Sequence, residues 1–137
     1  MIAGALEPLD TEIELFRHEA NARGLDLDGG SSLTALGYTS YVLASLLDGY
    51  EVALTVLYGA EKAYFDAWRT VRAGASPDSP YRAFIENWSS DAFCEWVDQV
   101  ASLLDAIEGA PTPPMRVAFE RTVRLEIAFW DAVGARE

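Results

Sequence analysis

The chain has 137 residues, a length typical of one domain, and half of them are apolar, which favours a packed core over a disordered segment. Its formal net charge is −12, from 10 basic and 22 acidic residues, so it lacks the positive surface that nucleic acids and anionic membranes attract. It has neither the start of a secretory signal peptide nor an apolar stretch near the ~20 residues of a membrane-spanning helix.

Helical periodicity runs through nearly the whole sequence. Apolar residues return every three or four positions, glycine- and proline-rich stretches interrupt the pattern, and no alternating strand pattern of useful length occurs. The predicted helices are residues 7–23, 33–48, 50–73, 81–88, 89–108 and 115–134. We therefore predict an all-α fold, an antiparallel bundle of five to six helices that forms a single domain over residues 1–137.

Two of the predicted helices have unusual compositions. Residues 33–48 (LTALGYTSYVLASLLD) are apolar on most sides, which predicts a largely buried helix that ends before Gly49. The long helix at residues 50–73 contains Gly59, and we expect this glycine to weaken it.

Two glutamates lie on apolar faces of predicted helices. Residues three, four and seven positions away share a helix face. Around Glu61 these residues are Leu54, Leu57, Tyr58, Tyr64, Phe65 and Trp68. Around Glu126 they are Phe119, Thr122, Val123, Phe129, Trp130 and Val133. Because an unpaired buried carboxylate is costly, each glutamate should either have a partner or have a raised pKa.

The residue pattern leaves two alternatives open. In the first, a tyrosine, a backbone group or an arginine satisfies each carboxylate for structural reasons. In the second, both carboxylates face one pocket and move protons near neutral pH. Tyr38, Tyr41 and Tyr64 fit a pocket for a flat heterocycle, since aromatic rings with hydroxyl tips stack on such a ligand and hydrogen-bond its edge. They are equally common as core residues.

Four motifs in chain order carry a resemblance to a known family. They are GYTSYVL, GAEKAYFDAW, YRAFIENWSSDAF and FERTVRLEIAFWDAV. Together they resemble the TenA family, which comprises thiaminase II and aminopyrimidine salvage enzymes with a haem-oxygenase-like fold. The resemblance covers essentially the whole chain. It implies a partial haem-oxygenase-like fold and hydrolysis of the C–N bond of an aminomethylpyrimidine or formylaminopyrimidine compound in thiamin salvage.

The resemblance also implies catalytic roles. A glutamate in the family's last helix acts as general acid and base, and it corresponds to Glu126. One subfamily carries a cysteine nucleophile at the position of Ala60, so this chain resembles the subfamily that lacks the cysteine. That subfamily has a glutamate beside the same position, which corresponds to Glu61. Glu61 would pair with Glu126 across the pocket and help to activate water.

Substrate-binding roles follow from the same motifs. Tyr64 matches the tyrosine of the subfamily's A-I-E-x-x-Y pattern, and Tyr38 matches the tyrosine of its Y-T-x-Y motif. Trp88 stands at an aromatic position near the substrate ring. Tyr41, one turn after Tyr38, completes the predicted substrate-binding set.

The chain departs from the family in its length. Roughly the family's first third is absent, including a helix that supplies an aspartate and an aromatic residue to the pocket. We therefore expect a homo-oligomer or a partner chain that completes the bundle. The alternative function is a non-catalytic TenA-derived binding or assembly protein, or one half of a split enzyme.

Other residues predict no additional chemistry. Cys94 does not correspond to the family nucleophile, and a single cysteine excludes a disulfide within the chain and fits the cytoplasm. His18 is the only histidine, so we predict neither a metal site nor a cofactor. The expected partner is a small-molecule pyrimidine, with no nucleic acid and no membrane.

Overall fold

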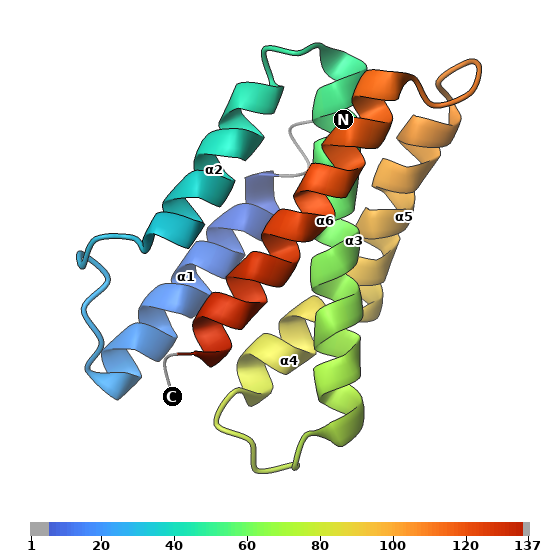
Figure 1. The fold of residues 1–137 in the computed structure, drawn as a ribbon. Helices are drawn as coiled ribbons and strands as arrows, with labels where there is room; N and C mark the ends of the chain where they lie inside the picture. Colours follow the sequence, from blue (N-terminus) through green and yellow to red (C-terminus); the bar gives the residue numbers. More distant parts are fainter. Residues whose placement is uncertain (1–5, 136–137) are drawn as a thin grey trace. The chain divides into compact units, whose positions relative to one another are not determined.

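A computed structural model describes residues 6–135, and these residues form six helices with no strand among them. The helices are α1 (Leu6–Arg23), α2 (Leu33–Ser45), α3 (Tyr50–Gly74), α4 (Arg82–Trp88), α5 (Asp91–Asp105) and α6 (Pro113–Gly134) (Figure 1). The predicted all-α class is confirmed. Two compact units divide the chain, one ending at Ser31 and containing α1, the other starting at Ser32 and containing α2–α6.

The helix boundaries follow from local signals in the sequence. The side chain of Ser32 accepts a hydrogen bond from the backbone N–H of Ala35 at 3.2 Å and caps α2. Ser90 caps α5 in the same way through the N–H of Phe93, at 3.1 Å. Gly49 precedes α3 with φ of +97°, a conformation that favours glycine and permits the sharp turn between α2 and α3.

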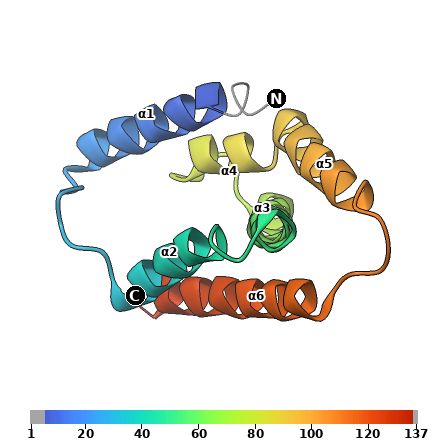
Figure 2. The ribbon, with the colours of Figure 1, turned by 90° about the horizontal axis from the view of Figure 1, so that it is seen from above.

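In the second unit, α3 lies at the centre of the bundle. Figure 2 shows α2, α4, α5 and α6 around it, and α3 packs on all four. Helix α6 lies close to α3 at Gly59, where an added Cβ would lie 3.2 Å from Cγ2 of Thr122. Gly59 therefore does more than weaken the helix, because its missing side chain lets α6 pack directly on α3.

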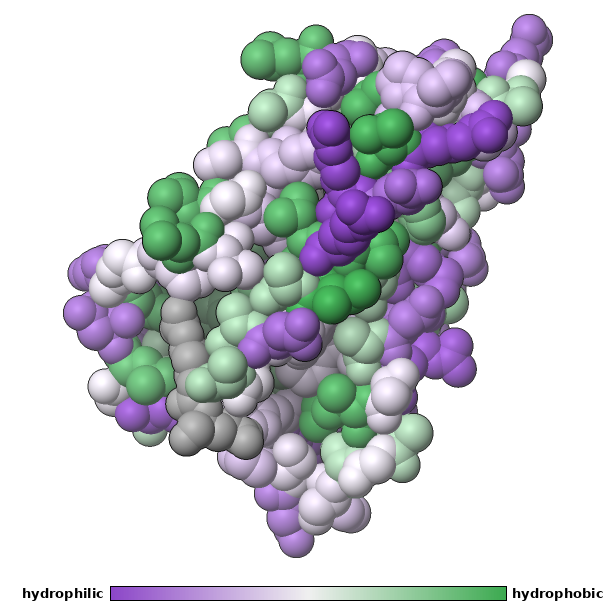
Figure 3. Space-filling view, in the orientation of Figure 1, coloured by the Kyte–Doolittle hydropathy of each residue, from purple (hydrophilic) through white to green (hydrophobic). Residues whose placement is uncertain are grey.

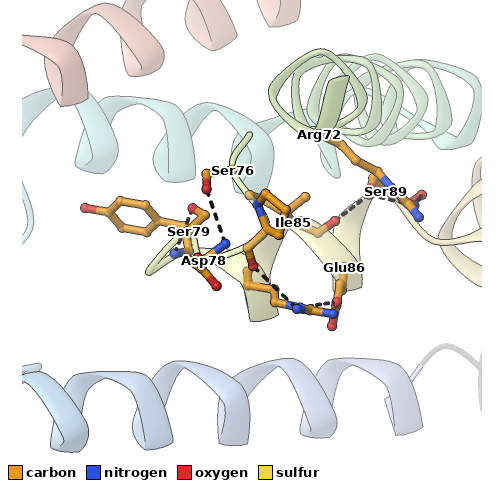
Figure 4. A network of polar contacts seen from close by, with 10 residues as sticks. Arg72, Ser76, Asp78, Ser79, Ile85, Glu86 and Ser89 are labelled. Atoms are coloured by element: carbon orange, nitrogen blue, oxygen red, sulfur yellow. Dashed lines mark hydrogen bonds and ion pairs between the residues drawn. The ribbon is translucent and has the colours of Figure 1, made fainter. Parts of the chain in front are cut away.

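A polar network joins the C-terminal part of α3 to the end of α4 (Figure 4). The guanidinium of Arg72 donates to the backbone carbonyl oxygen of Ser89 at 3.1 Å and to its hydroxyl oxygen at 3.3 Å. The hydroxyl of Ser89 in turn donates to the carbonyl oxygen of Ile85. These bonds fix the last turn of α4 against α3, and this turn carries Trp88.

The prediction that residues 33–48 are largely buried is wrong. Ser45 is the only buried residue of α2, and its leucines are exposed, as are Leu46 and Leu47 in the turn that follows. The helix is apolar on opposite sides, but α3 and α6 cover only one of them. Hydrophobic residues accordingly interrupt the polar surface in Figure 3 on the side where α2 lies. Among the helices between residues 6 and 135, none is long and apolar enough to cross a membrane.

Candidate active site

The side chain of Glu126 is buried in the second unit and held by two donors. Glu126 is only 5% exposed, and it lies on the face of α6 that packs in the bundle. The hydroxyl of Tyr38 on α2 donates a short hydrogen bond to Oε1. The indole N–H of Trp130, one turn along α6, donates to Oε2 at 3.2 Å. One carboxylate oxygen therefore has a donor from α2 and the other a donor from α6, and together these bonds fix the plane of the carboxyl group.

Burial changes the acidity of both partners. Removal from water raises the pKa of Glu126, and the hydrogen bonds from Tyr38 and Trp130 offset part of this effect by lowering it. Burial also raises the pKa of Tyr38, as do its hydrogen bond to Glu126 and the negative charges of Glu126 and Glu61. Tyr38 therefore remains a protonated donor, while Glu126 holds a proton to higher pH than an ordinary carboxyl group.

Glu61 belongs to the same electrostatic neighbourhood. It lies half-buried on α3, and its charge acts on the Tyr38 hydroxyl that Glu126 binds. The predicted face of Glu61 is confirmed in part, because Phe65 and Leu54 on the same stripe are buried. The direct pairing of Glu61 with Glu126 stays a prediction.

An aromatic cluster adjoins the carboxyl group of Glu126 through Trp130. The ring of Tyr64 lies 5.7 Å from that of Trp130 and 5.3 Å from that of Trp88, measured between centroids. Trp68 and Phe84 each stack on Trp88, with both centroid distances at 5.6 Å. Residues from α3, α4 and α6 thus build one aromatic cluster, in which Trp88 is buried and Trp130 lines a cavity.

The indole N–H of Trp68 is an unusual member of this cluster. The nitrogen is buried, and no residue between 6 and 135 accepts a hydrogen bond from it. A buried donor without an acceptor is costly, so a bound water or a ligand atom at this position would stabilise the site.

Glu126 and Trp130 also line a cavity. Its volume is about 340 Å³, and its wall comprises Ala63, Ala67, Val123, Glu126, Ile127, Trp130 and Asp131 from α3 and α6. This volume is within the range of small-molecule sites. A larger cavity of about 590 Å³ lies between α3, the α5–α6 loop and the first part of α6, but none of the predicted site residues lines it. The chemistry therefore favours the smaller cavity.

Four of the six predicted site residues are connected by hydrogen bonds or ring contacts, Glu61 acts on Tyr38 through its charge, and Tyr41 differs. Tyr38, Glu126, Tyr64 and Trp88 belong to the connected set described above. Tyr41 packs against the core residues Val52, Val56 and Ala118, and its hydroxyl donates to the carbonyl oxygen of Ala118 at 3.3 Å. These are contacts of a core residue, so its role in substrate binding stays a prediction.

Two residues of the site were missed as site residues. Trp130 and Trp68 appeared only as apolar neighbours of Glu126 and Glu61, because helix periodicity does not tell where an indole N–H points. The spacing i, i+4 between Glu126 and Trp130 was the available signal.

Cys94 lies on α5, with its sulfur 3.9 Å from a carboxylate oxygen of Asp98. Within residues 6–135 no group of three metal-ligating side chains gathers.

Comparison with known proteins gives one informative match. The chain is similar to the X-ray structure of a TenA homologue from Pyrococcus furiosus, with 31% sequence identity and a TM-score of 0.88. The alignment covers 94% of this chain and 65% of that chain, so the present sequence spans about two-thirds of the length of that homologue. No protein-family model and no curated protein matches the sequence.

Proposed function

Because this chain belongs to the TenA family, we propose that it hydrolyses the C–N bond of an aminomethylpyrimidine or formylaminopyrimidine compound, as an enzyme of thiamin salvage that uses no cysteine nucleophile. The activity, the substrate and the roles of single residues are parts of this proposal. The observation that carries it is the buried carboxyl group of Glu126, which Tyr38 and Trp130 hold in the wall of a cavity.

The chemistry assigned to Glu126 follows from its environment. A carboxyl group with a raised pKa holds and releases a proton nearer to neutral pH than an ordinary one. In the proposed reaction Glu126 accepts a proton from the attacking water and delivers a proton to the leaving amine. The C–N bond breaks, a C–O bond forms, and ammonia leaves when the substrate is a primary amine.

The remaining residues bind and orient. Tyr64 and Trp88 present their rings to the pyrimidine, and the buried N–H of Trp68 offers a donor to an acceptor atom of the ligand. Tyr38 keeps the carboxyl group of Glu126 in place, and Glu61 assists in activating water. Tyr41 supports α2 from the core side.

The test combines binding and turnover. The purified 137-residue chain is titrated with 4-amino-5-aminomethyl-2-methylpyrimidine while tryptophan fluorescence and ammonia release are followed together. Binding with ammonia release is expected. The fluorescence should report binding because Trp130 lines the cavity and packs on Trp68, which stacks on Trp88. Absence of both signals would overturn the proposal for this chain.

The Glu126→Gln variant tests the assigned role. It keeps the size of the side chain but cannot move protons, so ammonia release should fall by roughly 10²–10⁴-fold while the fluorescence titration still reports binding. Glu120→Gln is the matched control, because Glu120 lies on the same helix and is exposed. Turnover by Glu126→Gln equal to that of Glu120→Gln would remove Glu126 from the mechanism.

A second candidate function rests on the length of the match. The chain spans 65% of the homologous chain, so a binding or assembly protein built on the same fold, or one part of a split enzyme, is the alternative. Ligand binding without ammonia release in the titration supports a binding or assembly protein. Ammonia release that appears only when a second chain is added supports one part of a split enzyme.

A further inference from the structure

The larger cavity, of about 590 Å³, lies at one end of the second unit. The start of α3, the end of α5 and the start of α6 meet at this end in Figure 1, and the α5–α6 loop lines the same cavity. Its apolar wall includes the buried side chain of Met115 and the rings of Tyr58 and Phe119, whose centroids lie 6.5 Å apart with 22° between the ring planes. A cavity of this volume with such a wall suits the apolar body of a small organic ligand.

Acidic side chains outnumber basic ones around this cavity. The charged residues that line it are Glu51, Asp105, Glu108, Glu120 and Arg116. All four acids are exposed, and among residues 6–135 no ion pair joins any of them to a basic side chain. The Nε–H of Arg116 donates instead to the backbone carbonyl oxygen of Pro111 at 3.1 Å. The cavity therefore favours a positively charged ligand and disfavours an anion.

Helix stability does not account for two of these acids. Asp105 is the last residue of α5, Glu108 follows three positions later, and the last turn of α5 contains no basic residue. The C-terminus of a helix carries a partial negative charge, so a carboxylate is unfavourable at this end. Glu51 differs, because it lies in the first turn of α3, where a carboxylate stabilises the helix. A cation bound beside Asp105 and Glu108 would offset their repulsion.

We propose that this cavity binds a small organic cation, namely an ammonium group carried on an aromatic or aliphatic body. The ammonium group lies among the carboxylates that line the cavity, and the body packs on the rings of Tyr58 and Phe119. The face of an aromatic ring also attracts a cation, so this wall contacts both parts of the ligand favourably. The site is separate from the one proposed for hydrolysis, because neither Glu126 nor Trp130 lines it.

The first experiment compares three probes by NMR on the 137-residue chain. Benzyltrimethylammonium is the cation with an aromatic body, benzyldimethylcarbinol is a neutral alcohol of nearly the same shape, and benzenesulfonate is the anion. The chain has two methionines, Met1 and Met115, so isotope labelling of the methionine methyl groups provides one signal from the cavity wall. The Met115→Leu variant identifies this signal by its loss.

The cation should shift the Met115 signal saturably and bind at least about fivefold more tightly than the alcohol, because a single carboxylate at contact distance contributes about that factor. Its affinity should fall as the salt concentration rises, whereas that of the alcohol should not. Benzenesulfonate should cause no shift. Absence of a saturable shift at millimolar cation, or equal affinities for the cation and the alcohol, overturns the proposal.

A pair of double variants then tests which charges attract the cation. Glu51→Gln with Glu108→Gln should raise the dissociation constant of the cation at least about 10-fold and leave that of the alcohol unchanged, which also shows that the cavity is intact. Glu14→Gln with Glu95→Gln is the matched control, because it removes the same charge from two exposed glutamates that do not line the cavity. Equal affinity of the two double variants for the cation contradicts the proposed site.

Discussion

The hydrogen bond between Tyr38 and Glu126 is the feature that a single substitution tests most directly. Tyr38→Phe removes one hydroxyl group and keeps the ring, so the variant loses the donor to Oε1 of Glu126 and little packing. Since Glu126 is 5% exposed, water does not replace the lost donor without rearrangement. The variant therefore leaves one carboxylate oxygen of Glu126 without its partner.

The expected magnitude depends on the charge of Glu126. A hydrogen bond to a charged group contributes about 1.5–3 kcal/mol to stability and one between neutral groups about 0.5–1.5 kcal/mol. We expect Tyr38→Phe to lower the free energy of unfolding by about 2 kcal/mol when Glu126 is ionised and by about 1 kcal/mol when it is protonated.

The direction of the pH dependence follows from linkage. The folded pKa of Glu126 is raised above its ordinary 4.5, so between that value and the folded pKa the folded state holds a proton that the unfolded state has lost. The stability contributed by Glu126 is thus greatest at low pH and falls as pH rises through this window. Tyr38 lowers the pKa of Glu126, so its removal raises that pKa further and extends the loss of stability to higher pH.

The assay is urea unfolding of wild type and variant at a series of pH values from 4 to 8, followed by far-UV circular dichroism. Tyr41→Phe is the matched control, because its hydroxyl lies on the same helix but donates to the backbone carbonyl oxygen of Ala118. Its cost should be about 1 kcal/mol or less and independent of pH, since no ionisable partner is involved. Equal pH dependence of the two variants would refute the reasoning.

Two further predictions concern α6 and its neighbours. Trp130→Phe removes the donor to Oε2 of Glu126, so it should raise the pKa of Glu126 in the same series of urea unfolding curves from pH 4 to 8. Trp68→Phe should leave that pKa unchanged, because the N–H of Trp68 has no acceptor among residues 6–135. Gly59→Ala should destabilise the fold by about 1–3 kcal/mol in urea unfolding, because its Cβ meets Thr122 at 3.2 Å, and an increase in stability would show that α6 can move away.

The helices were predictable from the sequence because their signals are local. Ser32 and Ser90 cap helices through hydrogen bonds to residues three positions away, and the glycine- and proline-rich stretches separate the periodic segments. The face of Glu126 was predictable for the same reason, since its neighbours at i−4 and i+4 follow from helix geometry alone.

The burial of α2 was not predictable, because it depends on what packs against the helix. Periodicity and composition indicated apolar residues on most sides, but α3 and α6 cover only the side of Tyr41 and Val42. The hydrogen bond between Tyr38 and Glu126 joins residues 88 positions apart, and no local pattern specifies such a contact. The direction of the Trp130 N–H likewise depends on the rotamer of one side chain.

The position of Glu126 contrasts with that of three acids that pair with basic residues. Glu19, Asp66 and Glu86 form ion pairs with a basic residue four positions away on the same helix, and such pairs contribute little to stability. Glu126 instead costs free energy by its burial, and two neutral donors offset only part of that cost. Because a well-packed apolar residue often stabilises such a site, packing alone does not account for a carboxyl group here. The proton-transfer role that we propose for Glu126 at the cavity would account for it, and under this proposal the Glu126→Gln variant should lose turnover without losing its fold.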